Sequence, residues 1–186
     1  MSASPCFALL RGINLGRRQC VPMAELRRLL ESLGCIRVRT LLNSGNAVFE
    51  AQAHELQALG PALEAGLRER FGFQVPVVVG RTQALERVIV GNPLPGAVRN
   101  PGQFLVAFPT SEKLLDRAEP LRGENWRPEE LALAEGVAYL HCAVGIRASR
   151  LLRAFNRVLG NSVTTRNWAT ILKIWALHES QRTIPG

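Results

Sequence analysis

Hydrophobic and polar positions follow two periods along this chain, and together they predict a mixture of strands and helices. Short apolar runs, typical of strands, occur in the first half at residues 7–13, 38–42, 47–49 and 75–79. Leucines at helical spacing predict one helix that begins at Pro22 and ends at Gly34, and a second that ends near Gly72. Pro61 lies inside the second helix and is expected to bend or split it.

The same order of elements recurs in the second half. The expected elements are a short helix at 82–90, strands at 104–108, 130–134, 137–142 and 163–166, and helices at 112–121, 149–159 and 168–179. Glu135-Gly136 predicts a tight hairpin, and Ser149 predicts a helix N-cap. On the last helix we expect the buried side chains to be Trp168, Ile171, Leu172 and Trp175.

These patterns predict an α+β fold in which strand–helix–strand–strand–helix–strand occurs twice. That order is typical of the ferredoxin-like βαββαβ unit, so we expect two such units with antiparallel sheets, plus a C-terminal helix. The expected units are 1–91 and 103–186, because 92–102 is rich in proline and glycine and is typical of a linker.

Charge changes this picture because it is unevenly distributed. The net charge is +8, made up of +5 over residues 1–39, −3 over residues 40–145 and +6 over residues 146–186. Positive potential on the two terminal segments favours a polyanionic partner.

Cysteine and histidine spacing predicts no metal site, because the four cysteines form no CxxC pair and the three histidines are scattered. We expect reduced, packed thiols and no cofactor. The chain has no apolar run long enough for a membrane helix, and the apolar run before Arg11 is too short for a signal peptide. The expected location is cytoplasmic, and the oligomeric state stays open.

One candidate site lies where the first two strands end. In a ferredoxin-like sheet the loop after the first strand and the turn after the second strand lie at the same end. The anion or ligand candidates expected there are Arg11, Asn14, Arg17, Arg18, Asn43, Ser44 and Asn46. The alternative is that asparagine and glycine only satisfy turn geometry, which we prefer for 43–46. Glu25, in the first turn of the first helix, is a possible partner of Arg11.

The second half offers two further sets of candidates. Arg166 and Asn167 precede the last helix, where Asn167 or Thr165 suits an N-cap and Arg166 suits a carboxylate or phosphate. Arg150, Arg153 and Arg157 form a stripe opposite the apolar face of their helix. Such a stripe is usually only a solvated face, but it is also the best candidate for a nucleic-acid backbone contact.

Three motifs resemble a known family: ALLRGINLGRRQCVPMAEL (8–26), LLNSGNAVF (41–49) and VTTRNWATILKI (163–174). They resemble the bacterial family catalogued as domain of unknown function 1697, and the resemblance spans essentially the whole chain. It implies an α+β fold of ferredoxin-like type and no particular activity. Arg17-Arg18 stands where that family commonly has small or varied loop residues.

Three functional hypotheses follow. The leading one is a small cytoplasmic protein that contacts nucleic acid or another polyanion through its basic terminal segments. An enzyme or sensor for a small phosphorylated ligand at the Arg11–Asn46 end is the second, and an interaction scaffold is the third. Enzyme motifs are absent, so the sequence leans away from catalysis without settling it. A sequence-reading RNA-recognition motif is disfavoured, because the third strand offers only Phe49 as an aromatic side chain.

Overall fold

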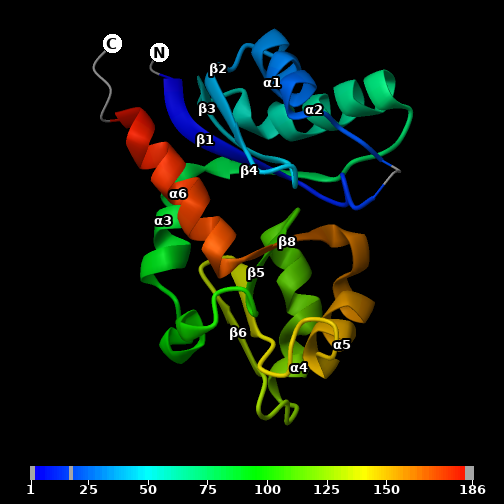
Figure 1. The fold of residues 1–186 in the computed structure, drawn as a ribbon, viewed down its shortest axis with the longest axis vertical. Helices are drawn as coiled ribbons and strands as arrows, with labels where there is room; N and C mark the ends of the chain where they lie inside the picture. Colours follow the sequence, from blue (N-terminus) through cyan, green and yellow to red (C-terminus); the bar gives the residue numbers. More distant parts are fainter. Residues whose placement is uncertain (1–2, 17–18, 183–186) are drawn as a thin grey trace. The chain divides into compact units, whose positions relative to one another are not determined.

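The computed structural model describes residues 3–16 and 19–182 (Figure 1). The strands are β1 (Ala3–Leu10), β2 (Ile36–Leu41), β3 (Asn46–Gln52), β4 (Val77–Arg81), β5 (Phe104–Pro109), β6 (Glu130–Ala134), β7 (Val137–His141) and β8 (Val163–Asn167). The α-helices are α1 (Met23–Ser32), α2 (Leu56–Phe71), α3 (Thr82–Val90), α4 (Glu119–Arg122), α5 (Arg150–Leu159) and α6 (Trp168–Arg182). The described residues also form three 3₁₀ helices: η1 (Pro95–Arg99), η2 (Glu112–Ala118) and η3 (Gly160–Ser162).

The strands of the described residues form two four-stranded sheets, with strand orders β2-β3-β1-β4 and β6-β7-β5-β8. All strand pairs are antiparallel. The two orders correspond strand for strand, since β5 pairs with β7 and β8 as β1 pairs with β3 and β4. The predicted α+β class with antiparallel sheets is confirmed.

Two compact units divide the chain: residues 1–83 with 173–186, and residues 84–172. The division therefore falls within α3 and α6 and differs from the expected boundaries at 91 and 103. The proline-rich segment 92–102 lies inside the second unit and is folded rather than an open linker. It contains η1, whose Ala97 is buried, and the amide of Ala169 donates to the Pro101 carbonyl at 3.4 Å.

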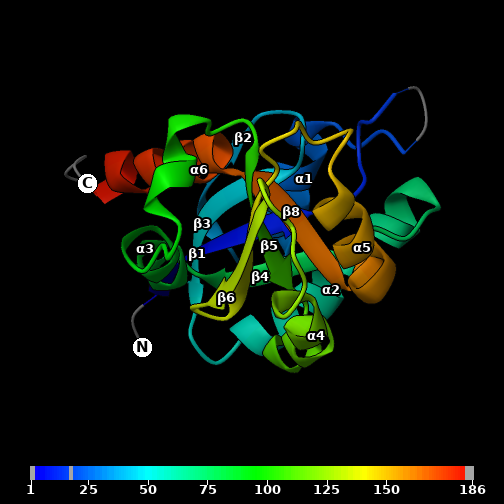
Figure 2. The same cartoon turned by 90° about the horizontal axis from the view of Figure 1, so that it is seen from below.

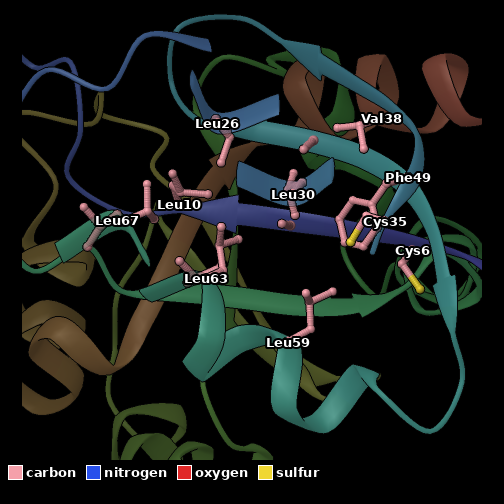
Figure 3. Close-up of a cluster of buried hydrophobic side chains, with 14 of the residues drawn as sticks. Cys6, Leu10, Leu26, Leu30, Cys35, Val38, Phe49, Leu59, Leu63 and Leu67 are labelled. Carbon is pink, nitrogen blue, oxygen red and sulfur yellow. The ribbon is translucent and has the colours of Figure 1, made fainter. Parts of the chain in front are cut away.

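The core of the first unit lies between its sheet and the helices α1 and α2. Figure 3 shows Leu10 of β1 among Leu26 and Leu30 of α1 and Leu59 and Leu63 of α2, and these leucines are 0–5 % exposed. Alternate β1 residues, Phe7 and Leu9, lie on the other face of the sheet and are buried as well. Both faces of the central strand are therefore apolar, which explains its continuous apolar run.

The core of the second unit lies between its sheet and the helices α4, α5 and η2 (Figure 2). Leu151, Phe155 and Leu159 of α5 pack there and are at most 1 % exposed. On the opposite face, the Tyr139 hydroxyl donates to the Val88 carbonyl at 2.8 Å. Burial, and after it the charge of Glu135, raises the pKa of Tyr139.

Several predicted local features, a turn and a helix cap among them, are confirmed. The β6–β7 hairpin turns at Glu135 and Gly136, whose φ values of 53° and 72° fit a type I′ turn. Ser149 caps α5, because its side chain accepts a hydrogen bond from the Leu152 amide at 2.8 Å. Pro61 does not split α2. The amide that proline lacks would bond to the carbonyl of Gln57, an exposed residue that water can reach.

Two helical predictions need correction. The expected helix at 112–121 is the 3₁₀ helix η2 followed by the single turn α4, because Pro120 has no amide to continue an α-helix. In α6 the buried stripe is Trp168, Ile171, Ile174 and His178. Leu172 is 42 % exposed and Trp175 is half-buried, so neither lies on the core face as expected. Within the described residues, no helix is both long and apolar enough to cross a membrane.

Candidate functional site

The first candidate region is where β1 and β2 end, and we call it the loop end: residues 11–16 and 19–21 together with 42–46. The Leu10 amide donates to the Gly45 carbonyl at 2.8 Å, which joins β1 to the β2–β3 turn. Gly45 has a φ of 76°, and a Cβ there would lie 2.6 Å from Leu10 Cβ and 2.8 Å from Ile13 Cδ1. Only glycine fits this close crossing of the two segments.

Asn14 ties the loop together with its side chain. Its Nδ2 donates to the carbonyls of Val21 at 3.0 Å and Asn43 at 2.6 Å, while its Oδ1 accepts from the Val21 amide at 2.9 Å. Both amide protons are used, so Asn14 has no donor left for a ligand. The predicted proximity of this loop to the 43–46 turn is therefore real, and the contact that makes it is structural.

Asn46 closes the turn in a similar way. It is buried, and its Nδ2 donates to the Leu41 carbonyl at 2.9 Å and to Ser44 Oγ at 3.0 Å. Ser44 and Asn43 are exposed at the turn. The turn-geometry interpretation thus describes the side-chain hydrogen bonds of Asn14 and Asn46, and it leaves the side chain of Asn43 facing solvent.

Arg11 lies at the base of the loop, half-buried, with its amide donating to the Pro76 carbonyl at 2.9 Å. Burial lowers the pKa of its guanidinium. Glu25, considered above as its partner, pairs instead with Arg28 and, at 3.2 Å, with Arg70. Arg17 and Arg18 lie outside the described residues.

This loop could bind an anion through backbone N–H groups rather than through amide side chains. Within the described part of the chain, the N–H groups of Gly12, Ile13, Leu15 and Gly16 donate no hydrogen bond. The φ values of Gly12, Asn14 and Gly16 are positive (71°, 56° and 146°), whereas those of Ile13 and Leu15 are not. Alternation of this kind is found where successive N–H groups converge on an anion.

The second candidate region lies at α5, and we call it the arginine face: Arg147 in the turn just before the helix, and Arg150, Arg153 and Arg157 on the helix itself. All four side chains are exposed. Among the described residues, no carboxylate oxygen lies within 4.0 Å of any of their guanidinium groups. The buried residues Leu151, Phe155 and Leu159 fix the orientation of the helix, so its three arginines point away from the core.

Two of these guanidinium groups are held by their surroundings. The Arg150 guanidinium carbon lies 5.9 Å from the centre of the Trp126 ring, and Trp126 Nε1 donates to the Leu121 carbonyl at 2.7 Å. Arg153 Nη1 donates to the carbonyls of Arg147 at 3.4 Å and Ala148 at 3.2 Å. Held groups lose less side-chain entropy when they bind.

Glu129 positions the start of α5, a role that the sequence did not indicate. It is 4 % exposed, and its Oε2 accepts from the amides of Arg150 at 3.0 Å and Leu151 at 3.2 Å. A carboxylate here satisfies the helix N-terminus and complements its dipole. Glu129 is 21 residues before Arg150, so a single sequence contains no signal of this contact.

The remaining predicted residues lie around the start of α6, in the second unit. Asn167 is the N-cap, because its Oδ1 accepts from the Thr170 amide at 2.9 Å. Arg166 is 9 % exposed, and its Nη1 donates to the Thr165 carbonyl at 3.0 Å. Burial lowers the pKa of Arg166 to about 10. Neither residue is part of the arginine face.

Among the described residues, the cysteines and the potential metal ligands form no further candidate site. All four cysteines are free, and only Cys20 is exposed. Burial raises the pKa of Cys35 to about 11 and also raises the pKa values of Cys6 and Cys142. Across residues 3–16 and 19–182, no group of three His, Cys, Asp or Glu side chains is arranged to hold a metal ion.

The fold and these regions define an α+β protein with two four-stranded antiparallel sheets and a basic helix face. The chain belongs to the family described as "Protein of unknown function (DUF1697)", whose model matches residues 4–139. The predicted family is thereby confirmed, and the matched residues include the motifs at 8–26 and 41–49, whereas the motif at 163–174 lies outside them.

A solved structure shares the fold: that of the conserved bacterial protein SP0830 from Streptococcus pneumoniae. It is 22 % identical in sequence and has a TM-score of 0.80, and the match covers 96 % of this chain and 99 % of that chain. At that identity the likeness shows the fold alone. No curated protein matches the chain.

Proposed function

We propose that this chain is a small cytoplasmic protein that binds a polyanion, and nucleic acid above all, through the arginine face of α5. The observation that carries the proposal is a set of four exposed guanidinium groups without a carboxylate partner, three on one side of a packed helix and one just before it. Some other surface arginines do have carboxylate partners, among them Arg37 with Glu50 and Arg122 with Glu119. Unpaired guanidinium groups gain more from a phosphate than paired ones, because no existing ion pair must be broken.

The surroundings of α5 support the same proposal. The segment 146–186 carries a net charge of +6, so the arginine face lies within the most basic part of the sequence. The four thiols are free, which suits a reducing compartment. We also propose that the two units are ferredoxin-like repeats that arose by duplication, since their element order and strand order correspond.

The test compares two triple variants that remove the same net charge. One is Arg150→Gln, Arg153→Gln, Arg157→Gln; its control is Arg37→Gln, Arg87→Gln, Arg122→Gln, three exposed arginines that each pair with a glutamate. Affinity for a generic duplex is measured by anisotropy between about 50 mM and about 200 mM salt.

We expect the α5 triple variant to lose affinity at least about tenfold at low salt and its log–log salt slope to flatten by roughly 2 to 3, because three phosphate contacts disappear. The control should stay close to the parent protein. Equal loss in both variants would mean that only net charge matters, and unchanged affinity in the α5 variant would mean that the stripe is only a solvated face.

A second candidate function, binding of a small phosphorylated ligand, is favoured by the free N–H groups of the loop end. Gly12 and Gly16 leave that backbone unobstructed, since nothing lies within 4 Å of an ideal Cβ at either position. Inorganic phosphate should then raise the Tm of the parent protein, and Arg11→Ala should abolish that shift. A Tm that phosphate leaves unchanged would reject this candidate without affecting the first one.

A further inference from the structure

We propose that the arginine face binds the phosphate backbone of double-stranded nucleic acid in preference to single strands. This inference rests on the proposed polyanion binding and adds the class of ligand. It depends on two observations that are independent of the net charge: where the aromatic rings lie, and how the guanidinium groups are held.

Aromatic side chains are not available to stack on bases around α5. Every aromatic residue of the second unit is at most 9 % exposed: Phe104, Phe108, Trp126, Tyr139, Phe155 and Trp168. Proteins that bind single strands usually gain much of their affinity by stacking unpaired bases on exposed rings. A single strand on this surface would gain charge contacts only, and it would lose its own flexibility in making them.

Trp126 illustrates the point, since it is the ring nearest to the arginine face. The guanidinium of Arg150 lies over it at 5.9 Å, so the protein itself already uses this ring as a stacking surface. The ring fixes Arg150, and the carbonyls of Arg147 and Ala148 fix Arg153. The surface therefore presents pre-positioned charges, not a platform for bases.

The spacing of those charges suits a rigid partner. Arg150 and Arg157 are seven residues apart on α5, which places their Cα atoms about 10 Å apart along the helix axis. A duplex carries one charge per about 1.7 Å of its axis, against about 3.4 Å for each strand alone. A duplex therefore has the stronger field, and its phosphates are already ordered, so a fixed row of guanidinium groups can meet them without ordering the partner.

An acidic membrane is the competing partner, because Val144 and Ile146, just before Arg147, are 48 % and 41 % exposed. Two aliphatic side chains in a loop give little apolar area to insert among lipids, whereas four arginines give a phosphate contact directly. The duplex is therefore the partner that the surface favours, and the membrane is an outcome of the test.

The experiment uses the full chain and four probes at one low salt concentration: a mixed-sequence DNA duplex, each of its two strands alone, and vesicles of phosphatidylcholine with phosphatidylserine. We expect the duplex to bind at least about tenfold more tightly than either strand. The triple variant Arg150→Gln, Arg153→Gln, Arg157→Gln should lose this preference, and the control triple variant at Arg37, Arg87 and Arg122 should keep it.

The outcomes separate the two proposals. Strands that bind as tightly as the duplex, with both lost in the α5 triple variant, would overturn the duplex inference and leave polyanion binding intact. Binding to none of the four probes would overturn both proposals. Binding to the acidic vesicles alone would overturn the duplex inference and would reject nucleic acid as the polyanion. A duplex preference that survives in the α5 triple variant would show that another surface is responsible, and it would also overturn the inference.

Discussion

The loop end and the arginine face are both candidate anion sites, but they use their polar groups in opposite ways. At the loop end, the amide groups of Asn14 and Asn46 donate to backbone carbonyls and to Ser44 Oγ, so the polar side chains hold the chain together. On α5, the polar side chains project outward and an apolar face holds the helix. The polar side chains in the turn thus serve the conformation of the chain, whereas the charged side chains on the packed helix are exposed and open to the partner proposed above.

The buried glutamate behind the arginine face completes this contrast. Glu129 belongs to the support of α5 and not to its exposed side, because its carboxylate accepts from two amides of the helix N-terminus. Each region therefore has a supporting layer: Asn14, Gly45 and Asn46 at the loop end, and Glu129 and Ser149 at α5. Substitutions in the supporting layers should change stability, and substitutions on the exposed layers should change binding.

The largest effect is expected from Gly45→Ala. The added methyl group meets Leu10 Cβ and Ile13 Cδ1 at under 3.0 Å, and the φ of 76° is unfavourable for alanine. We expect a loss of about 3 kcal/mol in the free energy of unfolding, or a fall in Tm of roughly 6–12 °C.

Gly72→Ala is the matched control, since Gly72 has a φ of 77° and nothing within 4 Å of its ideal Cβ. It should lose only about 1 kcal/mol, the cost of the backbone conformation alone. Equal losses in the two variants, measured by urea unfolding, would show that the crossing of β1 and the turn is not tightly packed.

Glu129→Ala should have the next largest effect. It removes two hydrogen bonds from a carboxylate to the Arg150 and Leu151 amides and leaves a buried cavity, so we expect a loss of about 3 kcal/mol at most. Ser149→Ala, which removes the neutral cap of the same helix, should lose about 1 kcal/mol. If Ser149→Ala proves the more damaging change in thermal unfolding, Glu129 does not hold the start of α5.

Much of the fold was predictable because local signals agreed with the final structure. Ser149 carries a capping hydroxyl, Glu135-Gly136 suits a type I′ turn, and the apolar run of β1 is buried on both faces. Contacts between distant segments were not predictable. Neither the Glu129 cap of α5 nor the ring of Trp126 under Arg150 leaves a periodic pattern in one sequence.

The same distinction explains the error in α6 and the difference between the expected boundaries and the observed units. Helical spacing allows either Leu172 or Ile174 beside Trp168 and Ile171, and tertiary packing selects Ile174. Proline and glycine in 92–102 indicate turns, but they do not tell whether those turns pack against a core. For the candidate sites, helical spacing predicted the exposed positions of Arg150, Arg153 and Arg157 on α5, whereas the role of Asn14 depended on where its amide protons go.

Asn14→Ala is expected to give the smallest of the three stability effects. It tests most directly whether the polar side chains of the loop end are structural or bind a ligand. The variant loses the three hydrogen bonds of the Asn14 side chain to Val21 and Asn43, and alanine tolerates the φ of 56° less well than asparagine. We expect a loss of about 2 kcal/mol in the free energy of unfolding, measured by chemical unfolding.

Asn43→Ala is the control at the same turn. Its side chain is exposed, and only its carbonyl accepts a hydrogen bond from Asn14, so its effect should stay within about 0.5 kcal/mol. Neither variant should alter duplex affinity, because the arginine face is untouched. An Asn14→Ala protein with unchanged stability and weakened phosphate binding would reverse the assignment, making Asn14 a ligand group and the loop end a binding site in its own right.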